Sequence, residues 1–248
     1  MENWANLNKI LLLGQKDSTT KKELGENLIA ASYSNNKEDA KKLLKMGASL
    51  NFNEEYVTPL IVCVENDFLD LAVFYIKAKA TITYRPTTNF MDALWYALIN
   101  KKHDFLKLFI NNYCLLPKHP ENNQTLLTYA TVTSDVKSVE FLLTHYRLNV
   151  NEKDWSGNTA LHYNIAKMNP SEDDISIGKM LLAAGADSNL PNIDGKTPAD
   201  LAVDGAARSL ILSNTLDKKL EKKEESKLEE SIKDTQPVTR MKNNKIKI

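Results

Sequence analysis

A short phrase recurs at a nearly constant interval along this chain. Its clearest copy is Thr159-Ala160-Leu161-His162. Related copies begin at Thr58, Asp92, Thr125 and Thr197, and a degenerate copy begins at Glu26. From Glu26 to Thr197 the six openings are separated by 32, 34, 33, 34 and 38 residues. Periods in this range are typical of solenoid arrays, in which one small structural unit stacks on the next.

A second phrase keeps a fixed distance from the first. The apolar pairs at 43–44, 75–76, 109–110 and 142–143 each lie 17 and 18 residues after an opening, and Gly-Ala steps follow at 47–48 and 185–186. Together, the Thr-Pro-Leu-His-like opening and the Gly-Ala close resemble the ankyrin-repeat family over roughly residues 25–202. A tetratricopeptide array has a similar period but requires a different aromatic and alanine pattern.

The apolar residues predict two short helices in each repeat. In the fourth repeat Leu127 and Ala130 are three apart and share one helix face, while Val139, Leu142 and Leu143 form the apolar stripe of a second helix. Neither helix can bury its stripe within one repeat, so each repeat must pack on its neighbours. We therefore predict an all-α, ankyrin-repeat solenoid of about six helix-turn-helix repeats with turn or hairpin tips.

The predicted organisation has three parts. Residues 1–23 form an N-terminal capping helix, for which a frayed tail is the alternative, and residues 216–248 form a charged, partly disordered tail. A solvated helix remains open for the Lys- and Glu-rich stretch 216–234. Between these parts lie the repeats, with boundaries at about 24–52, 53–86, 87–119, 120–153, 154–191 and 192–215.

Composition excludes several classes of function. The 32 basic and 32 acidic residues cancel, so no global field favours nucleic acid or an anionic membrane. The apolar run at 10–13 is too short for a signal peptide or a membrane span. Cys63 and Cys114 fall in different repeats, which makes a disulfide unfavourable. We expect a monomeric protein of the reducing cytoplasm.

No motif for catalysis, metal binding or cofactor binding occurs. There is no His pair at i, i+4 spacing, no Cys-x-x-Cys and no glycine-rich phosphate loop. His162 lies at the histidine position of the family phrase, which implies a structural bridge between adjacent turns. The acidic run after Ser171 suggests a metal site, but Ser171 followed by Asp174 also fits a helix-capping box, which we favour. We predict no enzyme activity, no metal and no cofactor.

The resemblance implies that a protein partner binds the concave side, formed by the turn tips and the first helices. The variable positions of the family on that side fall on Trp155, Tyr33, Phe52, Glu54, Glu55, Val57, Glu65, Met91, Ile99 and Lys167. Ile193 is at the position of the sixth repeat that corresponds to Trp155 in the fifth.

Two tryptophans receive opposite predictions. Trp155 lies in an Asp-x-x-Gly turn whose geometry needs Asp154 and Gly157 but nothing at position 155, so we predict an exposed anchor for a partner. Packing on a neighbouring turn is the alternative. Trp95 occupies the histidine position of the family phrase, and we predict that it is buried in the core.

Three functions remain open. The first is a non-enzymatic scaffold for a partner protein, and the second is an adaptor that its basic tail, residues 235–248, brings to an anionic membrane surface or nucleic acid. The third is regulation or inhibition of an enzyme partner. The repeats and the acidic block of Glu221, Glu224, Glu225, Glu229 and Glu230 resemble ankyrin effectors that intracellular bacteria export into host cells. In that case the partner is a host protein and the block an export signal; a charged solubilising tail is the alternative.

Overall fold

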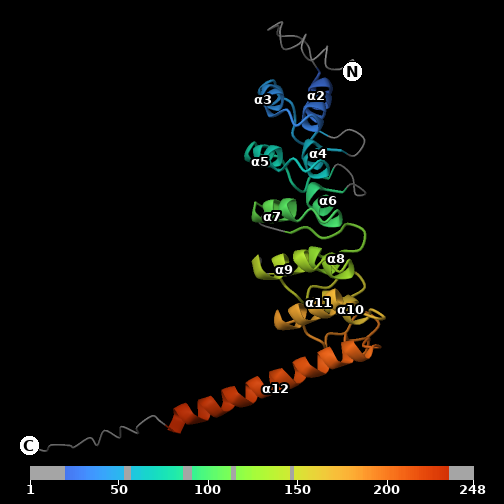
Figure 1. The fold of residues 1–248 in the computed structure, drawn as a ribbon, viewed down its shortest axis with the longest axis vertical. Coiled ribbons are helices and arrows are strands. Elements are labelled where there is room, and N and C mark those ends of the chain that lie inside the picture. The colour runs from blue at the N-terminus through green and yellow to red at the C-terminus, as the bar shows by residue number, and fades with distance from the viewer. Residues whose placement is uncertain (1–19, 53–56, 86–90, 113–115, 146–147, 235–248) are drawn as a thin grey trace, which may run out of the picture.

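Pairs of antiparallel helices are stacked along one axis in the computed structural model (Figure 1). The structure describes residues 20–52, 57–85, 91–112, 116–145 and 148–234. The first helices of five repeats form one column: α2 (Lys21–Tyr33), α4 (Pro59–Glu65), α6 (Ala93–Ile99), α8 (Leu126–Val132) and α10 (Ala160–Ile165). The second helices form a parallel column: α3 (Lys37–Lys45), α5 (Leu69–Lys77), α7 (His103–Asn111), α9 (Val136–His145) and α11 (Glu172–Ala183). The solenoid that the period predicts is confirmed.

The opening phrase marks the start of a first helix. The side chains of Thr58, Asp92 and Thr125 each accept a hydrogen bond from the backbone N–H three residues later, at 3.2, 2.9 and 3.0 Å. These bonds satisfy N–H groups that have no partner inside the helix. Pro59 fits the first turn of α4 because no hydrogen bond is needed from its nitrogen there.

The Gly-Ala step marks the end of a second helix. Gly47 has φ 99° and Gly185 has φ 91°, the left-handed conformation that stops a helix and that glycine adopts without strain. Lys79 takes the same place after α5 with φ 72°. The chain then returns to the tip of the next repeat.

The core runs continuously through the stack. The first member of each apolar pair on a second helix is at most 2% exposed, at Leu43, Tyr75, Phe109, Leu142 and Leu181. Ala31, Cys63, Ala97 and Ala130 on the first helices are at most 1% exposed, which lets the two helices of a repeat approach closely. Each helix is buried by the neighbouring repeats, as expected of a solenoid.

Both ends of the stack differ from the predicted boundaries. Thr20 and Glu23 form a capping box that starts α2 at Lys21, so this helix crosses the boundary predicted at residue 23. The sixth repeat has a single turn at 198–201 in place of a first helix, and one long helix, α12 (Gly205–Asp234), follows. Residues 1–19 and 235–248, with the predicted N-terminal cap and basic tail, lie outside the described residues.

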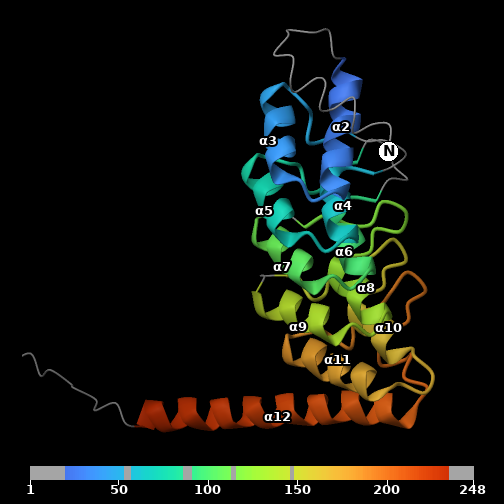
Figure 2. The same cartoon turned by 45° about the horizontal axis from the view of Figure 1, so that its top comes forward.

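The helix α12 begins against the stack and leaves it. Ala207 and Ile211 are buried, whereas Leu216, Leu220 and Leu228 are about 60% exposed. Figure 2 shows α12 crossing the lower end of the stack and extending well past the second helices. The stretch 216–234 is therefore helical, which decides between the two alternatives left open by the sequence. Among the described helices, α12 included, none has the length and apolarity that a membrane crossing requires.

Candidate functional site

The tips of the last three repeats are joined by backbone hydrogen bonds. The Trp155 N–H donates to the Asn122 carbonyl and the Ile193 N–H donates to the Ser156 carbonyl, each at 3.1 Å. These two bonds fix the fourth, fifth and sixth tips relative to one another. They lie at the N-terminal ends of the first helices, on the side where the sequence resemblance predicts partner contacts.

The fifth tip is held by Asp154 and Gly157. The Asp154 carboxylate accepts from the N–H groups of Ser156 and Asn158, both at 2.9 Å, and from the Tyr163 hydroxyl at 2.5 Å. Gly157 has φ 72°, and a Cβ on it would lie 2.8 Å from the Ile193 nitrogen, so the next tip leaves no room for a side chain. None of these interactions uses the indole of Trp155.

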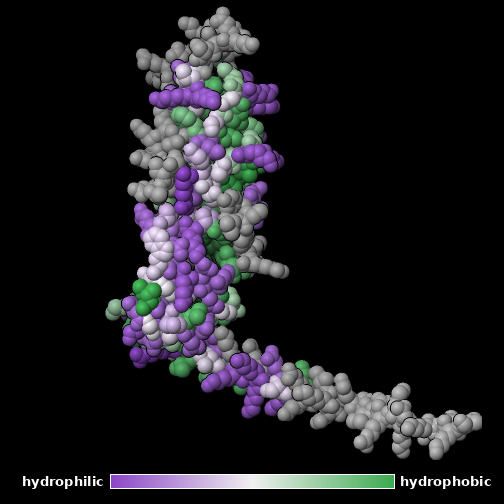
Figure 3. Space-filling view, turned by 180° about the vertical axis from the view of Figure 1, so that it is seen from behind, coloured by the Kyte–Doolittle hydropathy of each residue, from purple (hydrophilic) through white to green (hydrophobic). Residues whose placement is uncertain are grey.

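Two apolar side chains stand out from neighbouring tips. Trp155 is 65% exposed and Ile193 is 72% exposed, and each lies four residues before the opening of its repeat. We call Trp155 and Ile193 the tip pair. Seen from behind, the lower repeats are largely hydrophilic, and a few hydrophobic residues stand out separately (Figure 3). The tip pair is thus a small apolar feature on a polar surface, fixed by its backbone.

His162 bridges two tips. Its Nδ1 accepts from the Thr159 N–H at 3.1 Å, and its Nε2 donates to the Lys196 carbonyl at 3.2 Å. Burial lowers the pKa of the imidazole, so the neutral form is favoured. This arrangement confirms the structural interpretation of His162.

Lys167 is engaged within the array. Its ammonium donates to the Thr131 carbonyl at 3.0 Å, to the Ser134 hydroxyl at 2.8 Å and to the Asp174 carboxylate at 2.5 Å. Burial would raise the pKa of Asp174, but hydrogen bonds from Lys167, Ser134 and Ser171 outweigh it and hold the pKa well below its usual value. Although we predicted Lys167 as a partner contact, the structure gives its charge an internal role.

The network around Lys167 also explains the longer fifth repeat. Six residues, 166–171, separate α10 from α11, whereas three separate α8 from α9. Ser171 and Asp174 form the predicted capping box at the start of α11. The Asn164 amide donates to the Asp174 carbonyl at 2.9 Å, so the extra loop is anchored at both ends.

The other predicted contact residues differ in accessibility. Tyr33 and Glu65 are exposed, whereas Val57, Met91 and Ile99 are half-buried. Phe52 packs on α2, since a Cβ at Gly25 would lie 2.2 Å from its ring. Glu54 and Glu55 lie outside the described residues.

Trp95 belongs to the core, as predicted. It is 0% exposed, and its ring packs edge-on against His119 and Tyr129 with centroid distances of 5.0 and 5.7 Å. Such aromatic pairs stabilise a fold beyond the area that they bury. Trp95 takes the place of the histidine without reproducing its hydrogen bonds.

Within the described part of the chain, no three His, Cys, Asp or Glu side chains are grouped in a way that could hold a metal ion. Cys63 is fully buried, and this burial raises the pKa of its thiol. A raised pKa disfavours the reactive thiolate. Cys63 is therefore a packing residue of the core.

Comparisons with known proteins find similar repeats and a similar fold. A family model of ankyrin repeats in three copies matches residues 94–192. Among solved structures, an ankyrin repeat domain from Acinetobacter baumannii has a TM-score of 0.66 at 24% identity, covering 76% of this chain and 97% of that one. No curated protein sequence gives a significant match.

Two further solved structures share the fold. A chain in the complex of a predatory endopeptidase from Bdellovibrio bacteriovorus with an immunity protein has a TM-score of 0.58 at 23% identity, covering 74% of this chain and 95% of that one. The ankyrin repeat domain of Bcl-3, a member of the IkappaB family, has a TM-score of 0.54 at 19% identity, covering 79% and 99%. At these identities the likeness shows the fold alone. Ankyrin repeats are a domain type that generally mediates protein–protein interaction; residues 94–192 match that family, and the stack as a whole has the fold of an ankyrin-repeat solenoid.

Proposed function

We propose that this chain is a non-enzymatic interaction module that binds a partner protein through its tips and first helices, with the tip pair as anchor. One observation carries the proposal: Trp155 is 65% exposed on a turn whose hydrogen bonds are complete without its side chain. The fold does not need the indole, so its presence requires another reason.

An exposed indole is well suited to anchor a partner. Tryptophan is enriched among interface residues whose truncation costs the most binding energy, because a large rigid ring buries much apolar area. The backbone of the tip is fixed by neighbouring tips, so little conformational entropy is lost when the ring is covered. Ile193 extends the apolar contact onto the next tip.

Tyr33 and Glu65 continue this surface toward the first repeats. Both are exposed at the C-terminal ends of first helices, so they would extend the contact along these helices to the edge away from the tips. Met91, Ile99, Val57 and Phe52 supply half-buried contacts at its margin, and Glu54 and Glu55 stay predictions. We leave Lys167 out of the surface, because its ammonium is fully engaged by the array.

Regulation or inhibition of an enzyme partner is a second candidate function. It draws support from the endopeptidase and immunity-protein complex, one chain of which shares this fold. In that case the tips would cover an enzyme, and the catalytic residues would belong to the partner. The adaptor and exported-effector hypotheses depend largely on the tail, and deletion of residues 235–248 with no change of localisation would remove the support for the adaptor.

The test uses partner capture followed by titration. Proteins retained from cytosol by the full chain are identified, and the affinity of the purified partner is then measured for each variant by calorimetry. Trp155→Ala should weaken binding by about 2 kcal/mol, roughly thirtyfold. The control is Met168→Ala, because Met168 is 80% exposed but lies between α10 and α11, at the opposite edge.

Met168→Ala should leave the affinity within about twofold, since most surface substitutions have small effects. Unchanged binding by Trp155→Ala would remove the anchor and move the interface elsewhere. Equal losses in both variants would show that the captured protein recognises exposed apolar residues in general.

A further inference from the structure

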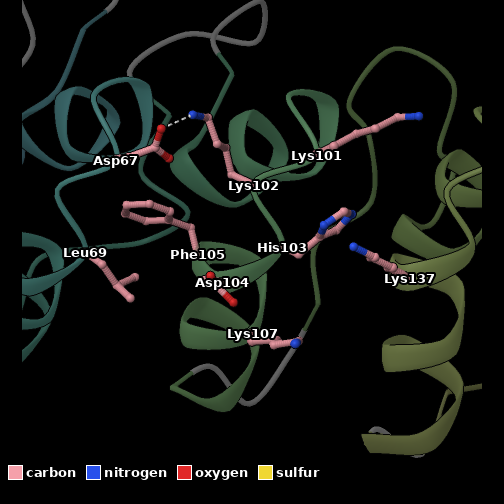
Figure 4. A pocket seen from close by; sticks show the side chains of 9 residues that line it. All are labelled: Asp67, Leu69, Lys101, Lys102, His103, Asp104, Phe105, Lys107 and Lys137. Carbon is pink, nitrogen blue, oxygen red and sulfur yellow. Dashed lines mark hydrogen bonds and ion pairs between the residues drawn. The ribbon is translucent and has the colours of Figure 1, made fainter.

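A cleft lies at the edge of the stack opposite the tips, where first helices turn into second helices. Its volume is about 650 Å³, and residues of the second, third and fourth repeats line it (Figure 4). Four of the lining residues are lysines and two are aspartates, an excess of two positive charges. We call it the basic cleft.

Three of its cations are uncompensated. Lys101, Lys107 and Lys137 are exposed, and none of their ammonium groups makes a hydrogen bond or ion pair with another described residue. They come from the turn before α7, from α7 itself and from α9. Figure 4 shows the Lys137 ammonium pointing toward the ring of His103. An anionic group in the cleft would meet positive charge from two repeats.

The cleft is already formed in the free protein. Lys102 pairs with Asp67 at 2.6 Å and joins the third repeat to the second. His103 Nε2 donates to the Asp135 carboxylate at 2.9 Å and joins the third repeat to the fourth. Both contacts fix the walls, so a ligand would not have to order them.

Two of the residues that line the cleft are apolar. Phe105 is 3% exposed and Leu69 is 37% exposed. A ligand that fits therefore combines negative charge at the rim with an apolar group against these two side chains. A free inorganic anion would use the rim alone.

The turn before α7 departs from the other turns at this edge. Lys101 has φ 53°, and the corresponding left-handed residues are Asn35 at 51°, Asp67 at 60° and Ser134 at 53°. Asparagine and aspartate tolerate this conformation better than a long side chain does. Lys102 then stands at the N-cap of α7 and supplies no side-chain cap, as is also true of Phe68 at α5, whereas Ser171 caps α11. The third repeat thus has two lysines where smaller side chains would stabilise the turn.

We infer that the basic cleft is a second docking surface, and that it takes an acidic segment of a partner protein in which Glu or Asp side chains flank an apolar residue. The carboxylates reach the ammonium groups of Lys101, Lys107 and Lys137, and the apolar residue packs on Phe105 and Leu69. Complementary charge both steers such a segment into the cleft and sets its register. This surface lies at the opposite end of the first helices from the tip pair and does not depend on it.

Fluorescence anisotropy tests this inference with a labelled peptide of repeated Glu-Glu-Leu units, titrated with the full-length protein at low ionic strength. The cleft variant combines Lys101→Glu, Lys107→Glu and Lys137→Glu. A matched control combines Lys41→Glu, Lys77→Glu and Lys179→Glu, three exposed lysines on second helices outside the cleft, so both variants have the same net charge. Thermal unfolding of each variant verifies the fold.

The wild type should bind the peptide, and the cleft variant should bind it at least ~10-fold more weakly, while the control should stay within ~2-fold. Trp155→Ala should bind it as the wild type does. No binding by the wild type, or equal losses in the two triple variants, would overturn the inference. A Lys-Lys-Leu peptide bound equally well would also overturn it, as would a single-stranded oligonucleotide bound more tightly and lost in the same cleft variant.

Discussion

The third and fifth repeats each have a tryptophan near the start of their first helix, and they use it in opposite ways. Trp95 is 0% exposed and packs against His119, at the end of its own repeat, and against Tyr129 of the following repeat. Trp155 is 65% exposed and packs against no other ring among the described residues. The same residue type stabilises the array in one repeat and remains available to a partner in the other.

The difference follows from how each tip is held. In the fifth repeat His162 makes hydrogen bonds with Thr159 and Lys196, and the Asp154 carboxylate accepts from two N–H groups of its own tip and from the Tyr163 hydroxyl on α10. In the third repeat Trp95 replaces the histidine, and Asp92 caps α6 while it pairs with Arg85 at 2.7 Å. Burial raises the pKa of the Asp92 carboxyl. Aromatic packing by Trp95 thus holds the tip of the third repeat, and the hydrogen bonds of His162 hold the tip of the fifth.

The largest effect is expected at the inward tryptophan. Trp95→Ala removes a fully buried ring and leaves a cavity between two repeats, which should cost about 3–5 kcal/mol. Chemical denaturation monitored by circular dichroism measures the loss. Trp95→Phe keeps part of the packing and should lose clearly less. A loss below ~1 kcal/mol in Trp95→Ala would mean that the third tip does not depend on this ring.

A smaller effect is expected at the loop of the fifth repeat. Lys167→Met keeps the aliphatic stem but leaves Asp174 without its cation, and should cost about 2 kcal/mol, less than for a fully buried pair because Lys167 is 21% exposed. Lys179→Met, an exposed position on α11, is the control and should stay within ~0.5 kcal/mol. Equal stability of the two variants would show that the network around Asp174 is dispensable.

A pH dependence should distinguish the two tips. Burial lowers the pKa of His162 in the folded protein, so its contribution is complete above the ordinary histidine pKa of about 6.5 and is lost as the pH falls through the lower folded value. Trp95, at the same position of the third repeat, does not titrate. Denaturant midpoints measured between pH 7.5 and 5 should fall less steeply in His162→Gln than in the wild type. An identical slope in both proteins would contradict the neutral, bridging role of His162.

Much of the fold could be predicted because local signals recur in every repeat. Thr58 and Thr125 cap helices, Gly47 and Gly185 end them, and the first residue of each apolar pair is buried. The helical state of residues 216–234 could not be predicted. This stretch has no apolar face whose burial would favour a helix over disorder, although Lys and Glu have good helix propensity.

The candidate site could be predicted only in part. The exposure of Trp155 could be predicted because it depends on a single turn, which needs only the nearby residues Asp154 and Gly157. The engagement of Lys167 did not, because Thr131 and Ser134 are 36 and 33 residues away in the sequence. The basic cleft was missed for the same reason, since three repeats line it. The side-by-side placement of Lys101 and Lys102 was its one sequence signal.

Thermal unfolding of Trp155→Ala tests most directly whether the outward indole is free for a partner. The melting temperature should stay within about 2 °C of the wild type, because Asp154 and Gly157 hold the tip and surface substitutions typically change stability by less than ~0.5 kcal/mol. A fall of many degrees, comparable with that of Trp95→Ala, would contradict the account. It would show that Trp155 belongs to the packing of the array itself.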